Sequence, residues 1–110
     1  MWVRVENPEI DGRVGKLTTA VWQYDDLARV GVMREIMLAP PYLWAEVLKG
    51  GLRNLRLAAT ALTELQKIII APTVYAEVAP HLPRNQAFLR YLGFKEIPAQ
   101  LARTIYVRSI

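Results

Sequence analysis

Residues 83–97, PRNQAFLRYLGFKEI, decide how the C-terminal part of this chain is interpreted. Pro83 suits the first turn of a helix, where its fixed backbone angle fits and its missing N–H is not needed. Gly93 can adopt the left-handed conformation that ends many helices. The stretch therefore predicts a short helix that stops at Gly93 and continues as a strand over residues 94–97. Three apolar residues recur at helical spacing and form its buried face: Phe88, Leu89 and Leu92.

Upstream, residues 51–71 give the clearest helical pattern in the chain. Pro72 follows directly and ends the helix, because the residue before a proline avoids the helical conformation. Cationic and hydroxyl residues recur at spacings of three and four, which predicts a solvated face. That face consists of Arg53, Arg56, Thr60, Thr63 and Lys67. The opposite, apolar stripe consists of Leu52, Leu55, Ala59, Leu62, Leu65 and Ile69.

The remaining segments are rich in β-branched and aromatic residues and predict strands. Their ranges are 1–6, 14–24, 27–38, 42–48, 73–79, 94–97 and 104–110. Turn residues separate them at 7–12, 25–26, 39–41 and 98–101. The strand, helix and strand at 42–48, 51–71 and 73–79 should form a right-handed crossover between parallel strands. The order predicts an α+β fold with a mixed sheet of six or seven strands, one long helix and one short helix.

Composition restricts the class of protein. The 110 residues suit one domain, residues 1–110, and a hydrophobic content of 53% favours self-association or a protein partner. No apolar run approaches the roughly 18 residues that span a membrane, and the N-terminus lacks signal-peptide features. The chain has no cysteine and only one histidine, His81, so neither a metal cluster nor a Ser-His-Asp triad is expected. The net charge of +4 is not concentrated in one run, which argues against nucleic-acid binding. A cytoplasmic or virion location fits best.

The strand order and the run NQAFLRYLGF at residues 85–94 resemble the C-terminal half of the GNAT acetyltransferase fold. In that family a helix ending in Leu-Gly-Phe follows the fifth strand. The family's two N-terminal helices have no counterpart, because residues 7–13 are too few. The compact form, with TVYAEVAPHLPRNQAFLRYLGF at residues 73–94, is similar to GNAT-like proteins of tailed bacteriophages, including internal virion proteins.

The resemblance implies an acetyl-CoA site. Parallel strands at 42–48 and 73–79 would splay apart to admit the pantetheine arm, and the pyrophosphate would lie at the start of the long helix. The corresponding residues are Lys49, Gly50, Gly51, Leu52, Arg53 and Asn54, with Asn85 in the second helix. The two glycines are adjacent, whereas the family spaces them. A tight turn that only joins strand to helix, next to a solvated basic face, is the alternative interpretation.

The resemblance also implies a general base, for which Glu46 and Glu77 are the candidates, with His81 a further one. The family's proton-donating tyrosine is replaced by Leu89, and Tyr91 faces elsewhere on the helix. The position of the family's helix-head asparagine is held by Leu82.

These departures predict a GNAT-fold protein with a degenerate acetyl-CoA site that acts as a non-catalytic virion or host-interaction module. A small acetyl-CoA-dependent N-acetyltransferase acting on a protein or an amine is the alternative. A third hypothesis is a small α+β inhibitor of host proteins that binds through apolar surface.

Overall fold

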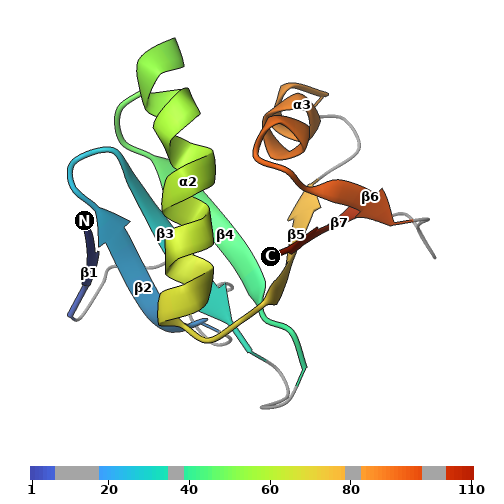
Figure 1. The fold of residues 1–110 in the computed structure, drawn as a ribbon, viewed down its shortest axis with the longest axis horizontal. Helices are drawn as coiled ribbons and strands as arrows, with labels where there is room; N and C mark the ends of the chain where they lie inside the picture. The colour runs from blue at the N-terminus through green and yellow to red at the C-terminus, as the bar shows by residue number, and fades with distance from the viewer. Residues whose placement is uncertain (7–17, 35–38, 79–82, 98–103) are drawn as a thin grey trace.

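The computed structural model describes residues 1–6, 18–34, 39–78, 83–97 and 104–110. These residues form one seven-stranded sheet and two helices, as Figure 1 shows. The predicted α+β class is therefore confirmed. In chain order the elements are β1 (Trp2–Arg4), β2 (Thr18–Tyr24), β3 (Ala28–Met33), β4 (Tyr42–Val47), α2 (Leu52–Ile68), β5 (Thr73–Val78), α3 (Pro83–Tyr91), β6 (Lys95–Ile97) and β7 (Thr104–Ser109).

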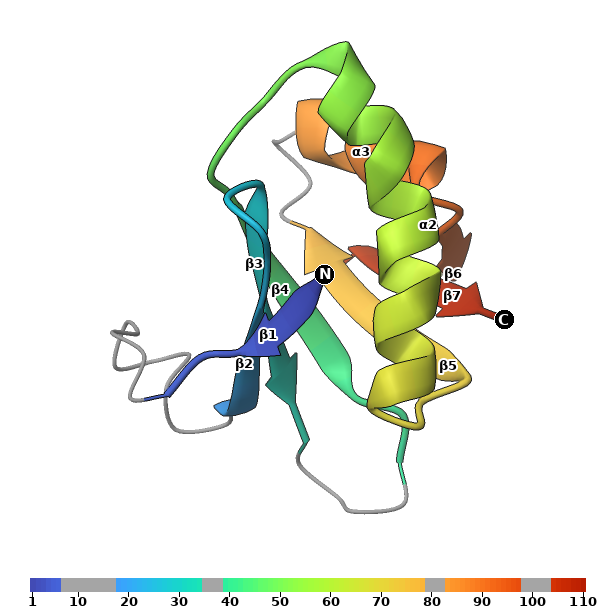
Figure 2. The same ribbon diagram turned by 60° about the vertical axis from the view of Figure 1, so that its left-hand side comes forward.

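The strands lie in the order β1-β2-β3-β4-β5-β7-β6. Every neighbouring pair is antiparallel except β4 and β5, which are parallel as predicted and are joined through α2. Figure 2 shows that α2 and α3 lie on the same face of the sheet. We call this the helix face and the other side the open face, because no described helix covers it.

Element ends differ from the sequence prediction at two places. The third strand ends at Met33, so that Arg34 of the predicted strand lies outside it, and the long helix ends at Ile68 instead of residue 71. The helix stops because Ile70 adopts a positive φ of 54°. The N–H of Ile70 then bonds to Lys67 O, and the N–H of Ala71 bonds to Gln66 O, which is the hydrogen-bond pattern of a helix-terminating motif.

Several sequence predictions fall outside the described residues. They are the turn at 7–12, the absence of helices over residues 7–13, the strand start at 14–17, the strand end at 35–38, the loop that carries His81 and Leu82, and the connection at 98–101.

The core lies between α2 and the helix face of the sheet. Leu62 and Leu65 of the predicted apolar stripe are buried there. Trp2 on β1 is buried as well and donates from Nε1 to Ala61 O at 2.6 Å, which attaches the edge of the sheet to α2. Its ring meets Tyr24 edge to face, with ring centroids 5.1 Å apart. Trp22 and Tyr24 pack against this core.

The Leu-Gly-Phe run ends α3 in the predicted way. Gly93 has a φ of 94°, its N–H bonds to Arg90 O, and the N–H of Phe94 bonds to Leu89 O. Phe94 is buried, so the same turn that ends the helix sends the chain back into the core.

Arg108 on β7 is buried, with 8% of its surface exposed, and no pattern in the sequence predicts this. Its guanidinium donates to Leu92 O at 2.7 Å and to Gln66 Oε1 at 2.6 Å. It also donates to Ala59 O at 2.9 Å and to Thr63 Oγ1 at 2.7 Å. Burial lowers the pKa of Arg108, because the charged form is desolvated. Thr63, predicted on the solvated face, is therefore half-buried and turned toward β7.

Candidate functional site

The candidate site begins where β4 and β5 separate. All six residues of β4 pair with β3, and all six residues of β5 pair with β7. Between them, however, β4 and β5 pair at one position only, Tyr42 with Tyr75, next to a hydrogen bond of 2.9 Å from Tyr75 N to Pro41 O. The strands are thus held together at their amino ends and diverge toward their carboxyl ends, as the resemblance predicts.

Helix α2 begins at this diverging end of the sheet (Figure 1). Gly51 precedes the helix with a φ of 113°, a conformation that favours glycine. No side chain caps the helix, and its first turn carries no acidic residue. Asn54 Nδ2 donates to Gly50 O at 2.9 Å and holds the preceding loop against the first turn. No carboxylate or hydroxyl of the described residues therefore caps the first backbone N–H groups of α2, and the helix dipole favours an anion beside them.

The three cations around the start of α2, which are Lys49, Arg53 and Arg56, have different roles. Lys49 Nζ lies 2.6 Å from Asp26 Oδ2, and this contact raises the pKa of Lys49 and lowers that of Asp26, chiefly through the hydrogen bond and then through charge attraction. Lys49 N also donates to Leu27 O at 3.1 Å, so Lys49 attaches the loop to the β2–β3 turn. Arg53 and Arg56 are exposed, and no ion pair or hydrogen bond of either side chain is found among the described residues.

The two candidate bases lie on one face of the sheet. Side chains alternate along a strand, and Val74 and Ala76 of β5 are buried on the helix face, so Glu77 projects from the open face. Leu43 of β4 is buried on the helix face, which places Glu46 on the open face too. Both glutamates are exposed, one on each diverging strand. The structure therefore brings Glu46 and Glu77 to the same face and the same end of the sheet.

In the second helix, Leu89 is half-buried against the core, whereas Tyr91 is 48% exposed. The two side chains point in different directions, as predicted from their spacing. The structure describes only the backbone of Asn85 in α3 and of Leu52 in α2. Their predicted contacts with a cofactor remain predictions.

Sequence reasoning missed two features beside the site. Asp26 was predicted only as a turn residue, and nothing local reveals its pairing with Lys49 across a separation of 23 residues. Trp44 on the open face lies directly over Gly31, so that a Cβ on Gly31 would stand 1.8 Å from Trp44 Cε2. Trp44 Nε1 donates to Thr18 Oγ1 at 3.0 Å. A glycine inside a strand is the only sequence signal for such a close approach.

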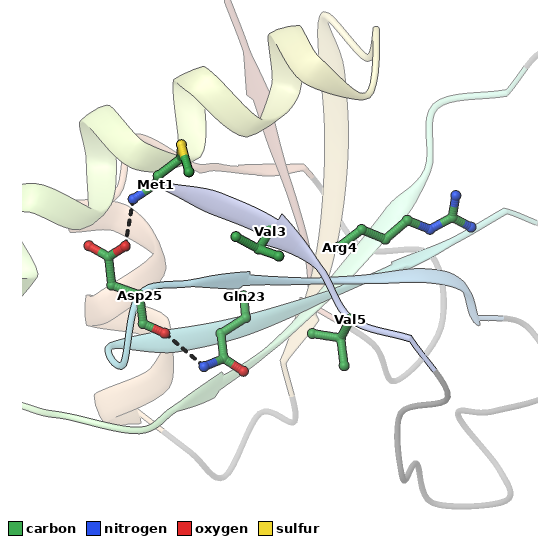
Figure 3. Close-up of a pocket in the computed structure, with 6 residues that line it drawn as sticks. All are labelled: Met1, Val3, Arg4, Val5, Gln23 and Asp25. Carbon is green, nitrogen blue, oxygen red and sulfur yellow. Dashed lines mark hydrogen bonds and ion pairs between the residues drawn. The ribbon is translucent and has the colours of Figure 1, made fainter.

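A separate shallow pocket of about 310 Å³ lies at the β1 edge of the sheet. Figure 3 shows its lining, with the N-terminal amine of Met1 paired to Asp25 Oδ1 at 2.7 Å and Gln23 Nε2 donating to Asp25 O at 2.7 Å. The pocket is lined by β1, β2 and Asp25, and β3 lies between β2 and β4, so the pocket is not part of the candidate site.

Within the described residues, no group of three potential metal ligands occurs. In the same part of the chain, no helix is long and apolar enough to cross a membrane.

Neither a family model nor a curated protein matches this chain in sequence. Solved structures do match it in fold. The N-acetyltransferase PseH of Campylobacter jejuni, in complex with acetyl coenzyme A, has a TM-score of 0.61 at 8% identity and covers 82% of this chain and 65% of its own. The ribosomal-protein-S5-alanine acetyltransferase of Vibrio fischeri has a TM-score of 0.59 at 13% identity, covering 88% and 64%. An acetyltransferase of Agrobacterium tumefaciens has a TM-score of 0.58 at 12% identity, covering 83% and 60%.

The chain has the GNAT fold. The Leu-Gly-Phe turn and the single β4–β5 pair thus occur in the architecture that the resemblance implied. The chain spans less than two-thirds of the length of these three GNAT-fold structures.

Proposed function

We propose that this GNAT-fold chain binds acetyl-CoA at the diverging ends of β4 and β5 and transfers the acetyl group to an amine. The observation that carries the proposal is the single β4–β5 pair beside the uncapped N-terminus of α2. Unpaired strand edges offer backbone N–H and C=O groups to an amide-containing arm.

The residues present suit the anionic part of the cofactor. The α2 N-terminus offers N–H groups and a favourable dipole. Arg53 and Arg56 are exposed and lie in the first two turns, where a cation opposes the dipole unless an anion is bound. Lys49 is held by Asp26, so we assign it to positioning of the loop rather than to phosphate binding.

Bound acetyl-CoA would supply an acetyl thioester: the amine nitrogen bonds to the carbonyl carbon, the carbon–sulfur bond breaks, the amine gives up a proton and the thiolate takes one. Glu46 and Glu77 are the candidate acceptors of the amine proton, directly or through water. They project from the open face, so the amine would approach from that face while α2 binds the phosphates on the helix face. Leu89 offers no proton to the thiolate, which would take it from solvent.

The half-buried Leu89 favours a second candidate function. Leucine has no acidic group, and it occupies the position of the tyrosine that donates a proton in the family. In this alternative the chain is a non-catalytic virion or host-interaction module, phage-encoded, with a protein partner or a second copy of itself. Native mass spectrometry at rising concentration tests the self-association, and a monomer throughout contradicts it.

Calorimetric titration with acetyl-CoA tests the binding. We expect micromolar to millimolar affinity that weakens about tenfold in Arg53→Ala and again in Arg56→Ala, since tenfold corresponds to about 1.4 kcal/mol. Lys67→Ala is the matched control, because Lys67 is an exposed cation in the last turn of the same helix. Unchanged binding in the arginine variants contradicts the proposed phosphate site.

Release of free CoA thiol in the presence of polyamines or lysine peptides tests the transfer. We expect turnover that falls in Glu46→Gln or Glu77→Gln while acetyl-CoA binding persists. Binding without turnover on any amine favours the non-catalytic module.

A further inference from the structure

Tyr106 on β7 carries a polar group without a partner in the middle of the core. The side chain is fully buried, with 0% of its surface exposed. Among the residues that the structure describes, its hydroxyl has no hydrogen-bond partner. A buried hydroxyl in that condition costs about 1–3 kcal/mol, and a phenylalanine would fill the same space without the cost. Such a group calls for a partner from outside the described residues.

The position of Tyr106 indicates where that partner would come from. Tyr106 stands opposite Ala76 on β5, one residue beyond Tyr75, where the pairing of β5 with β4 stops. It lies on the helix face, because Arg108, two residues further along β7, donates to α2 at Ala59 and Thr63. Two residues span about 6.6 Å along a strand. Tyr106 is therefore displaced from those contacts toward the carboxyl end of β5, the diverging end of the site.

Trp22 Nε1 can be compared with the Tyr106 hydroxyl. Trp22 Nε1 also lacks a partner within the described part of the chain. Trp22 is on β2, opposite Arg4 of β1, and β3 and β4 separate it from β5. Of these two residues, only Tyr106 lies on a strand that pairs with β5.

We propose that Tyr106 is a ligand-binding residue whose hydroxyl donates a hydrogen bond to a carbonyl group of acetyl-CoA bound between β4 and β5. The inference rests on the proposed cofactor binding and adds a residue that the sequence did not single out. The pantetheine arm carries amide carbonyls that can accept such a bond. The hydroxyl is covered in the free protein, so binding must shift the core side chains that cover it.

The test compares Tyr106→Phe with the wild type in two measurements, with Tyr24→Phe as the matched control. Tyr24 undergoes the same chemical change on the same face, but at the β1 side of the sheet. In thermal unfolding without ligand, Tyr106→Phe should have the same melting temperature as the wild type or a higher one, because no bond is lost. In calorimetry, its affinity for acetyl-CoA and for CoA should fall about five- to tenfold, while Tyr24→Phe binds normally.

Each contrary result has its own meaning. If the wild type binds acetyl-CoA and Tyr106→Phe binds it equally well, the role of Tyr106 is overturned while the proposed function stands. A clear drop in melting temperature for ligand-free Tyr106→Phe overturns it too, because the hydroxyl then has a partner, such as a buried water, in the free protein. If the wild type binds neither acetyl-CoA nor CoA, both the proposed function and this inference are overturned.

Discussion

Replacing Arg108 with methionine should strongly destabilise this protein. Arg108 connects three parts of the fold, because it extends from β7 to α2 at Ala59, Thr63 and Gln66 and to the end of α3 at Leu92. Methionine keeps most of the apolar stem but donates no hydrogen bond. The change therefore removes the donors from this position and leaves its packing largely intact.

The magnitude follows from which acceptors lose their donor. Ala59 O keeps a hydrogen bond from Thr63 Oγ1 at 3.2 Å. Leu92 O and Gln66 Oε1 accept from Arg108, and no second donor to either is found among the described residues. Two unpaired buried acceptors at about 1–3 kcal/mol each give about 2–6 kcal/mol. Relief of the guanidinium desolvation, seen in the lowered pKa of Arg108, offsets part of this cost. We expect a net loss of about 3 kcal/mol, a large share of the 5–15 kcal/mol that is usual for a domain.

Urea unfolding followed by circular dichroism measures this loss. The matched control is Arg90→Met, whose exposed partner Glu96 lies 3.5 Å away and which should cost less than about 0.5 kcal/mol. A double-mutant cycle with Gln66→Met should show a coupling of about 1–2 kcal/mol, because the two side chains share one network. A loss below about 1 kcal/mol for Arg108→Met, or additive effects in the cycle, would refute the reasoning.

Three further perturbations follow from local geometry. Ile70→Gly should raise the melting temperature by about 4 °C in a thermal scan, because Ile70 is a β-branched residue at a φ of 54° that is 85% exposed; an unchanged or lower value contradicts this. Gly31→Ala should cost about 2–3 kcal/mol in urea unfolding, and less in a Trp44→Leu background, since the added Cβ meets Trp44; equal costs in both backgrounds exclude that clash. Asp26→Asn should remove a small pH-dependent stabilisation. The folded-state pKa of Asp26 lies below its ordinary value of 3.8, so this stabilisation is complete above pH 3.8 and is lost as the pH falls through the lowered pKa. The folded-state pKa of Lys49 lies above its ordinary value of 10.5, so the stabilisation is complete below pH 10.5 and is lost as the pH rises through the raised pKa. A stability difference between variant and wild type that does not vary with pH rules the pair out.

The fold could be predicted because its signals are local. Gly93 ends α3, a periodic apolar stripe marks α2 and alternating apolar residues mark the strands, so element types were predicted correctly throughout the described residues. The end of α2 could not be predicted, because Ile70 takes a conformation that its own side chain disfavours. Only the packing of the finished fold keeps it there.

The candidate site was predicted only in part, for a related reason. Its backbone elements follow from strand order, and the one-position pairing of β4 with β5 agrees with the predicted splay. Lys49 differs in role from Arg53 and Arg56 because it pairs with Asp26, which is distant in sequence. Pairings of that kind leave no periodic pattern, and they decide which cations are free to meet a phosphate.

The Leu-Gly-Phe turn links the predictable and the unpredictable parts of this protein. Gly93 ends α3 through its backbone conformation, and the sequence shows that directly. The buried Leu92 O at the same turn accepts the hydrogen bond from Arg108, so the turn also fixes α3 to β7 and α2. A Cβ on Gly93 would lie 3.6 Å from Arg108 Nε, an ordinary contact. Space around the turn is therefore not what requires glycine. The backbone conformation requires it, and Arg108 then uses the carbonyl that this conformation presents.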